Sequence, residues 1–303
     1  MQSLPIDFTQ RVWGTFGQAG IKWIHHFPAL LKEISERWSL TLLPPFDNLS
    51  YNYVAPVIRK DGTQAVLKLG VPNKELITEI EALHLMHGRG TVQLFESDHE
   101  LGALLLERLI PGRPVYELAD DEAATSIAVQ WMEHGWEPVP EGHPFPTVSD
   151  WAKGFQRLRS EFEGATGPFP EDLVFKAERV FQDLLGSMSD PVLLHGDLHH
   201  WNILSAEREP WLAIDPKGVV GEPAYEVGAW LRNPFPHLLG LDDLQTMIER
   251  RVSQFSEGLG FGEERMVKWG FTQAVLAGWW SYEEHSEDWK SWIAVAEVFI
   301  SML

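Results

Sequence analysis

Three polar side chains at the edges of two short apolar runs are of the types that phosphoryl transfer uses. Asp197 and Asn202 lie on one loop after the apolar run 192–194, and Asp215 ends a second apolar run, 211–214. Phosphoryl transfer needs a carboxylate that orients and deprotonates the attacking hydroxyl, and oxygen ligands that hold Mg²⁺ on the nucleotide phosphates. We therefore expect Asp197 to act as the base, and Asn202 and Asp215 to bind Mg²⁺.

The spacing within this stretch supports that chemistry. His195 and Asp197 are followed by four residues and then Asn202, which is the spacing of the catalytic loop of protein kinases. Proline and glycine follow Asp215 and stop regular structure there. We expect a hairpin between the two apolar runs to bring Asp215 beside Asn202.

A zinc site, or a simple polar turn, is the alternative for residues 195–200, which include three histidines. Neither alternative explains the asparagine at 202 or the aspartate at 215, whereas phosphoryl transfer uses both. The chain has no cysteine, which excludes disulfides, cysteine-based zinc sites and a cysteine nucleophile.

Lys68 lies in another apolar run, 65–69, and needs a negatively charged partner there. Burial of the Lys68 ammonium costs several kcal/mol unless a counter-charge meets it, and the following segment, 73–87, has helical spacing. On a helical wheel Glu79 lies about 60° from the centre of the apolar stripe and Glu81 about 140° away, so Glu79 is the expected partner. The alternative is a lysine on an edge strand whose stem extends to water.

The catalytic loop and several further segments resemble aminoglycoside phosphotransferases and related small-molecule kinases, most closely the streptomycin and hydroxyurea resistance kinases. That family has an H-G-D-x-x-x-x-N loop and a metal aspartate after isoleucine at a strand end. The resemblance covers roughly residues 40–300, and its further matches are 49–54, 66–70, 104–109 and 221–226.

The resemblance implies an α+β, two-lobed protein-kinase-like fold with ATP and Mg²⁺ as cofactors. Residues 1–110 form an N-terminal nucleotide-binding lobe, with an antiparallel sheet of about five strands and a helix. Residues 111–303 form a mainly helical C-terminal lobe for catalysis and substrate binding. The implied reaction transfers the γ-phosphoryl group to a hydroxyl of a small cationic molecule. The resemblance indicates an aminoglycoside, with streptomycin as the leading candidate.

The resemblance also implies roles for residues outside the catalytic loop. Lys68 and Glu79 position the phosphates, and the backbone of Glu107 and Leu109 reads the adenine edge. The loop 47–52 has no glycine, so Ser50 is the expected phosphate donor there, although an ordinary turn serine is the alternative. On the segment after the metal strand, Glu222 and Glu226 are expected to support the active site, and both are candidate substrate carboxylates.

The charge of the chain is acidic and unevenly distributed. Residues 1–110 carry 12 acidic and 10 basic side chains, a net −2, and the remaining residues carry 32 and 14, a net −18. This charge argues against nucleic-acid binding. Most of it is expected to form a solvated surface, and the functional alternative is a small cationic substrate. Glu283 and Glu284 lie among tryptophans between the last two expected helices, 262–282 and 286–302, and are candidate contacts for such a cation.

Targeting signals and membrane spans are not predicted. No run approaches the length of apolar residues that a membrane crossing requires, and the first residues lack the features of a signal peptide, which predicts a cytoplasmic protein. Two other functions fit the same motifs: a choline, methylthioribose or fructosamine kinase, and a nucleotide-binding protein that has lost catalysis.

Overall fold

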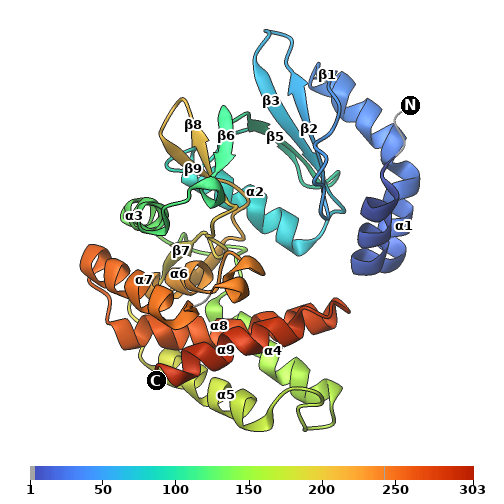
Figure 1. Ribbon diagram of the computed structural model, residues 1–303. Coiled ribbons are helices and arrows are strands. Elements are labelled where there is room, and N and C mark those ends of the chain that lie inside the picture. Colours follow the sequence, from blue (N-terminus) through green and yellow to red (C-terminus); the bar gives the residue numbers. More distant parts are fainter. Residues whose placement is uncertain (1–3, 242) are drawn as a thin grey trace. The chain divides into compact units, whose positions relative to one another are not determined.

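The computed structural model of the protein describes residues 4–241 and 243–303 (Figure 1). The chain divides into two compact units after Gly112, close to the boundary expected from the sequence after residue 110. The first unit is a sheet with helices and the second is mainly helical, which confirms the predicted α+β class.

The N-terminal unit contains a five-stranded antiparallel sheet in the order β1-β2-β3-β5-β4, in agreement with the predicted sheet. Its elements in chain order are α1 (Ile6–Arg37), β1 (Thr41–Leu42), β2 (Tyr53–Ile58), β3 (Gln64–Leu69), α2 (Lys74–Met86), β4 (Leu94–Asp98) and β5 (Ala103–Glu107).

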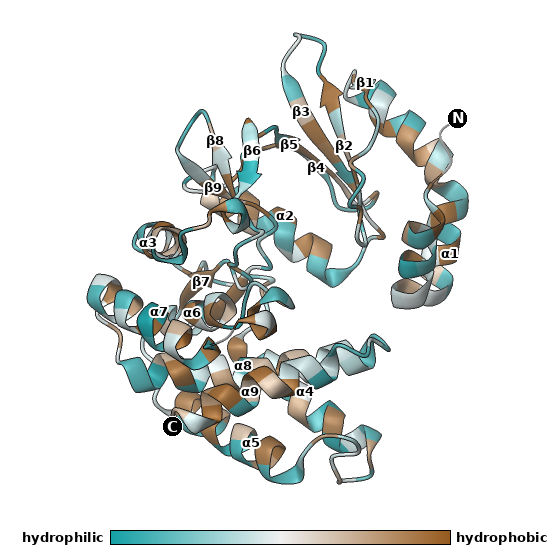
Figure 2. Cartoon of the chain, in the orientation of Figure 1, coloured by the Kyte–Doolittle hydropathy of each residue, from teal (hydrophilic) through white to brown (hydrophobic). Residues whose placement is uncertain are grey.

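Side chains alternate between the two faces of β3, because a strand has a period of two. Ala65, Leu67 and Leu69 are buried in one cluster with the apolar face of α1, which includes Phe27. Lys68 therefore points away from α1. Figure 2 shows the apolar residues of β2 and β3 in brown.

Helix α1 is broken at Gly17, whose φ of 53° and ψ of −128° are not helical. A Cβ atom on Gly20 would lie 2.4 Å from the carbonyl oxygen of Val12, so the two halves of α1 pack closely there. Pro28 lies inside the second half of α1, where its neighbour Phe27 is buried in the cluster that joins α1 to the sheet.

The C-terminal unit combines short strands with long helices. In chain order it has β6 (Pro111–Pro114), which spans the boundary, a 3₁₀ turn at Val115–Glu117, α3 (Asp121–Met132), α4 (Val148–Glu161), α5 (Glu171–Gly186), β7 (Val192–Leu194), β8 (Ile203–Ala206), β9 (Trp211–Ala213), β10 (Val219–Gly221), α6 (Pro223–Leu231), a second 3₁₀ turn at His237–Gly240, α7 (Leu244–Leu259), α8 (Glu263–Glu283) and α9 (Trp289–Ser301). Strands β7 and β10 pair with each other, and β6, β8 and β9 form a three-stranded sheet.

Helix α8 lies at the centre of this unit and packs against α5, α6 and α9. Trp269 and Trp279 of α8 are almost fully buried and belong to the core of this unit. Within the part of the chain that the structure describes, no helix is both long and apolar enough to cross a membrane.

Candidate active site

The loop between β7 and β8 folds back on itself through Asn202. The backbone N–H of Asn202 donates to the carbonyl of His199 over 2.8 Å, and its side-chain Nδ2 donates to the carbonyl of Asp197 over 3.0 Å. Since the amide nitrogen is used within the loop, the amide oxygen is the atom of Asn202 that is oriented for a metal.

The β8–β9 hairpin brings Asp215 back to this loop, as the sequence predicted. Ile203 pairs with Ala213 in the hairpin, and the backbone N–H of Ile214 donates to the carbonyl of Asn202 over 2.9 Å. Asp215 has a φ of 58°, a left-handed conformation that few residue types other than glycine, aspartate and asparagine adopt readily. The backbone turns sharply at the proposed metal ligand.

His195 connects the two strand ends from within the core. It is fully buried, its Nε2 donates to the carbonyl of Ile214 over 2.8 Å, and its own carbonyl accepts from the N–H of Lys217 over 2.8 Å. Burial lowers the pKa of His195 to about 4, so the imidazole is neutral near pH 7. In the described residues no three histidine, aspartate or glutamate side chains are grouped to hold a metal, which leaves the zinc alternative without support.

Glu226 of α6 holds the start of the catalytic loop. Its Oε1 accepts from the N–H of Gly196 over 3.0 Å, and burial raises the pKa of this carboxyl to about 7. Gly196 has a φ of 85°, and a Cβ atom there would lie 2.8 Å from Val219, so only glycine fits. Because Glu226 is 1% exposed, its role as a substrate carboxylate was wrong, and its role in supporting the active site stays a prediction.

Glu222, at the start of α6, is also unavailable to a substrate. It is 1% exposed, and its carboxylate accepts hydrogen bonds from the guanidinium of Arg265 over 2.7 and 2.8 Å and from the indole nitrogen of Trp269. The substrate assignment of Glu222 was therefore wrong, because the carboxylate is buried and already bonded to Arg265 and Trp269.

Arg232 and His199 flank the carboxylate of Asp197. Arg232 Nη2 lies 3.4 Å from Asp197 Oδ1, and His199 Nε2 lies 3.7 Å from Oδ2. The Asp197 side chain is 25% exposed and that of Arg232 only 12%. The sequence analysis missed Arg232, although the signal resembled that of Lys68: a lone cation at the end of an apolar helix, after Ala229, Trp230 and Leu231.

A second buried arginine fixes the middle of the loop. Arg251 of α7 is 1% exposed; its guanidinium donates to Asp121 of α3 over 3.0 Å and lies 3.1 Å from Nε2 of His200. The His200 ring stacks on Trp230 with 3.8 Å between centroids. Desolvation lowers the pKa of His200 well below its usual value, so the neutral ring accepts from Arg251.

In the N-terminal unit, Lys68 and Glu79 form the expected ion pair. Lys68 Nζ lies 2.6 Å from Glu79 Oε1, and the two side chains are 6% and 8% exposed. Glu81 lies on the outer face of α2 and pairs with His99 over 2.8 Å. The helical wheel therefore selected the right glutamate.

The other predicted nucleotide contacts of this unit lie in loops or at a strand end. Ser50 is exposed in the loop before β2, and the guanidinium of Arg11 in α1 donates to the carbonyls of Ser50 and Leu49 over 3.3 and 2.7 Å. Glu107 ends β5, and Leu109 follows it outside the strand. Arg11 is a further residue that the sequence analysis missed, because its partners are backbone atoms about 40 residues away.

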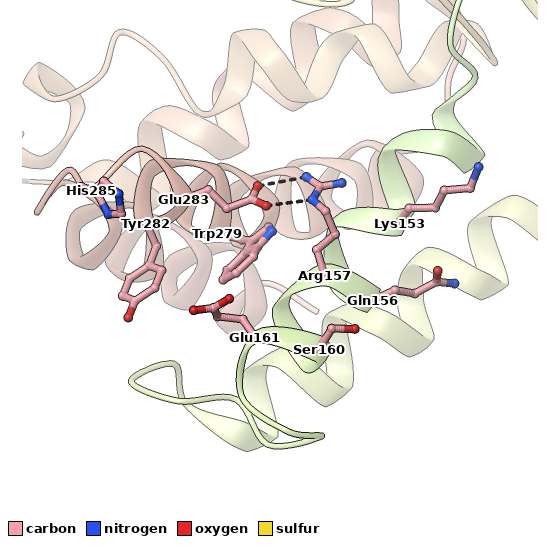
Figure 3. A pocket seen from close by; sticks show the side chains of 9 residues that line it. All are labelled: Lys153, Gln156, Arg157, Ser160, Glu161, Trp279, Tyr282, Glu283 and His285. Carbon is pink, nitrogen blue, oxygen red and sulfur yellow. Dashed lines mark hydrogen bonds and ion pairs between the residues drawn. The ribbon is translucent and has the colours of Figure 1, made fainter. Parts of the chain in front are cut away.

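The acidic turn between α8 and α9 lies next to a separate pocket of about 810 Å³ between α4 and the end of α8 (Figure 3). Glu283 lines this pocket and accepts two hydrogen bonds, over 2.8 and 2.9 Å, from Arg157 of α4. Glu284 follows α8 and is exposed. The pocket shares no lining residue with the loop around Asp197.

The donor set of the C-terminal unit fits Mg²⁺. One carboxylate, Asp215, and the amide oxygen of Asn202 are hard oxygen ligands, and Mg²⁺ in kinases commonly takes one or two protein oxygens together with phosphate oxygens and water. Asp197 is partly exposed beside them, so it is able to meet a hydroxyl. The three residues predicted from the sequence therefore occur together on one loop and hairpin.

Known proteins resemble this chain over most of its length. The sequence matches the family described as "Aminoglycoside/hydroxyurea antibiotic resistance kinase" over residues 41–285. It is 31% identical to the streptomycin 6-kinase of Streptomyces glaucescens, over 89% of this chain and 88% of that protein, and 32% identical to the hydroxyurea phosphotransferase of Kitasatospora aureofaciens, over 94% and 82%.

A solved structure supports the same fold. The choline kinase LicA from Streptococcus pneumoniae superposes with a TM-score of 0.62 at 14% identity, covering 91% of this chain and 99% of that one, which confirms the predicted protein-kinase-like fold. The chain therefore belongs to the aminoglycoside/hydroxyurea antibiotic resistance kinase family, and it is a phosphotransferase that acts on an alcohol group.

Proposed function

We propose that this kinase transfers the γ-phosphoryl group of ATP to a hydroxyl of a small antibiotic, with streptomycin as the first acceptor to test. The observation that carries this proposal is the arrangement of Asp197, Asn202 and Asp215 on one loop and hairpin. The Lys68–Glu79 ion pair adds the phosphate-positioning lysine that such a reaction needs.

Asp197 is the proposed base. Its carboxylate orients the acceptor hydroxyl and takes its proton as the oxygen attacks phosphorus. The loop that carries Asp197 is fixed by Glu226 through Gly196 and by Arg251 through His200, so the carboxylate is positioned before the substrate arrives.

Asn202 and Asp215 are the proposed ligands of Mg²⁺, which when bound neutralises charge on the phosphate oxygens. Lys68 binds the α- and β-phosphates, and Glu79 keeps the lysine charged and in place. The hydroxyl of Ser50 contacts phosphate, and the backbone of Glu107 and Leu109 contacts the adenine.

A cationic part of the acceptor, distant from the reacting hydroxyl, is proposed to contact Glu283 and Glu284. The net charge of −18 on residues 111–303 attracts such a molecule over long range. Glu283 already binds Arg157, and the aromatic rings of Trp279 and Tyr282 line the same pocket (Figure 3).

The test is acceptor-dependent release of ADP by the purified full-length protein with ATP and Mg²⁺. We expect streptomycin or hydroxyurea to stimulate ADP release well above the rate without acceptor. Stimulation only by choline, methylthioribose or a fructosamine would keep the chemistry and replace the acceptor. Nucleotide binding without ADP release for any of these acceptors would contradict the proposal and favour a non-catalytic nucleotide-binding protein.

A further inference from the structure

The carboxylate of the proposed base has a cation fixed beside it. Arg232 Nη2 lies 3.4 Å from Asp197 Oδ1, and the Arg232 side chain is only 12% exposed. Arg232 Nε is buried and has no hydrogen-bond partner among the described residues. Because Nε is enclosed by the protein, a ligand would bond to the terminal nitrogens of the guanidinium, of which Nη2 lies beside Asp197.

Hydrogen bonds fix the backbone at the end of α6, where Arg232 lies. Arg232 caps the C-terminus of α6, where a positive charge is favourable, and its N–H bonds to the carbonyl of Gly228 over 3.2 Å. The next residue, Asn233, donates from Nδ2 to the carbonyl of Ala229 over 2.9 Å and accepts at its own carbonyl from Arg251 over 2.6 Å. The end of α6 that carries Arg232 is thus bonded to α7 through Asn233 and Arg251.

An aromatic surface continues from this cation. The guanidinium carbon of Arg232 lies 5.4 Å from the ring centroid of Trp292 on α9, and Trp292 stacks on Phe235 with 3.7 Å between centroids and 13° between planes. Trp292 and Phe235 are both partly exposed. The guanidinium beside Asp197 therefore adjoins a flat aromatic stack.

We infer that Arg232 is a specificity-determining residue, which selects acceptors whose reacting hydroxyl neighbours an uncharged oxygen, such as an N-hydroxy or α-hydroxy carbonyl group. This inference rests on the proposed function. A carbonyl or ether oxygen beside the hydroxyl accepts a charge-assisted hydrogen bond from Arg232, whereas an ammonium or guanidinium at the same place is repelled by it.

The overall charge of the unit does not reverse this local preference. Exposed charges are screened over about 8 Å at physiological ionic strength, and Arg232 lies well within that distance of the proposed base, at 3.4 Å from Asp197 Oδ1. The net −18 draws a cation to the unit, while Arg232 governs which end of the acceptor reaches Asp197.

In the proposed reaction one bond to the γ-phosphorus replaces another. The bond between the γ-phosphorus and the β–γ bridging oxygen breaks, a bond from phosphorus to the acceptor oxygen forms, and the hydroxyl proton moves to Asp197. ADP leaves with the bridging oxygen. Arg232 takes no proton in this step, because a guanidinium remains charged in proteins.

The experiment compares hydroxyurea, whose hydroxyl neighbours a carbonyl, with streptomycin, whose ring hydroxyls neighbour guanidinium groups. For the wild type we expect a higher kcat/KM with hydroxyurea. Arg232→Met, which keeps the apolar stem, should lower the ratio of kcat/KM for hydroxyurea to that for streptomycin by roughly 10- to 100-fold, the range that one charge-assisted hydrogen bond supplies.

Two further variants sharpen the test. Arg232→Lys keeps the charge but loses the planar donor, so it should still discriminate against streptomycin while using hydroxyurea less well. Arg179→Met is the matched control, because Arg179 lies 5.9 Å from the ring of Phe175 on α5, and it should leave the ratio unchanged.

Several results would overturn the inference. An equal fall in kcat for both acceptors in Arg232→Met, with KM unchanged, would make Arg232 a positioning residue for Asp197 alone, and an unchanged ratio would remove it from acceptor recognition. If the wild type releases ADP with neither acceptor, the proposed function fails. Calorimetric binding of both acceptors, with ADP and Mg²⁺ present, then still decides whether Arg232→Met shifts the preference.

Discussion

Asp197 and Asp215 are both aspartates close to strand ends, yet their surroundings fit the different roles proposed for them, a base and a metal ligand. Asp197 is partly exposed between Arg232 and His199, where a hydroxyl is able to reach it. Asp215 has left-handed backbone geometry and follows Ile214, whose N–H is bonded to Asn202, the other proposed metal ligand.

Substitution of the two aspartates should therefore separate catalysis from nucleotide binding. Asp197→Asn removes the proton acceptor, so kcat should fall about 100-fold or more while the Kd for Mg²⁺-ATP stays near that of the wild type. Asp215→Ala removes a metal ligand and should weaken Mg²⁺-ATP binding itself. Calorimetry and steady-state kinetics measure both effects, and wild-type turnover in Asp197→Asn would refute its role as base.

Glu226 should make stability depend on pH. Burial raises the pKa of this carboxyl from 4.5 to about 7 in the folded protein. Between these values the folded protein holds a proton that the unfolded chain has released, so stability is lost as the pH rises through this window. Glu226→Gln has no such proton, and its Tm should rise relative to the wild type between about pH 5 and about pH 8.

Thermal unfolding at several pH values measures this difference. Glu297→Gln is the control, because Glu297 is an exposed carboxylate on α9. A Tm difference between Glu226→Gln and the wild type that stays constant with pH would mean that Glu226 titrates at its ordinary value.

At the scale of elements, two helices hold functional side chains by different means. Helix α2 is capped by Asn73, whose side chain accepts from the N–H groups of Glu75 and Leu76. The same helix places Glu79 beside Lys68. Helix α7 instead carries Arg251, which joins Asp121 of α3 to the catalytic loop. Helix α2 thus positions a lysine proposed to bind phosphate, and α7 positions a backbone loop.

The two glutamates of α2 should differ in their effect on nucleotide use. Glu79→Gln leaves the buried Lys68 ammonium without its counter-charge and should raise the KM for ATP and lower kcat. Glu81→Gln changes a partly exposed pair with His99 and should behave like the wild type. ATP kinetics of both variants test this, and the opposite ranking would show that Lys68 does not need Glu79 for function.

At the scale of the whole molecule, the negative charge belongs almost entirely to the residues after 110, while the total is −20. Local positive charge nevertheless occurs within that acidic part, at Arg232 and Arg157. We therefore predict that long-range attraction of a cation and selection of the acceptor at the site are separate effects.

Salt should separate these properties for a cationic acceptor. If Glu283 and Glu284 contact a cation of streptomycin, Glu283→Gln or Glu284→Gln should raise its KM roughly tenfold and weaken the dependence of KM on salt up to about 1 M, where screening acts within ~3 Å. The KM for ATP should not change. Glu263→Gln, at the other end of α8, is the control. Wild-type KM values for streptomycin in both variants would place its cation elsewhere.

The sequence by itself determined the parts of this protein that depend on local spacing. The catalytic loop, the hairpin that returns Asp215, and the face of α2 that carries Glu79 all follow from residue types within about 20 positions of one another. Only the tertiary structure decided that Arg232 lies beside Asp197, that Arg251 meets His200, and that Glu222 and Glu226 are buried. The physical reason is that periodicity shows which face of a helix is apolar, whereas the polar groups that gather at its ends depend on how distant helices pack.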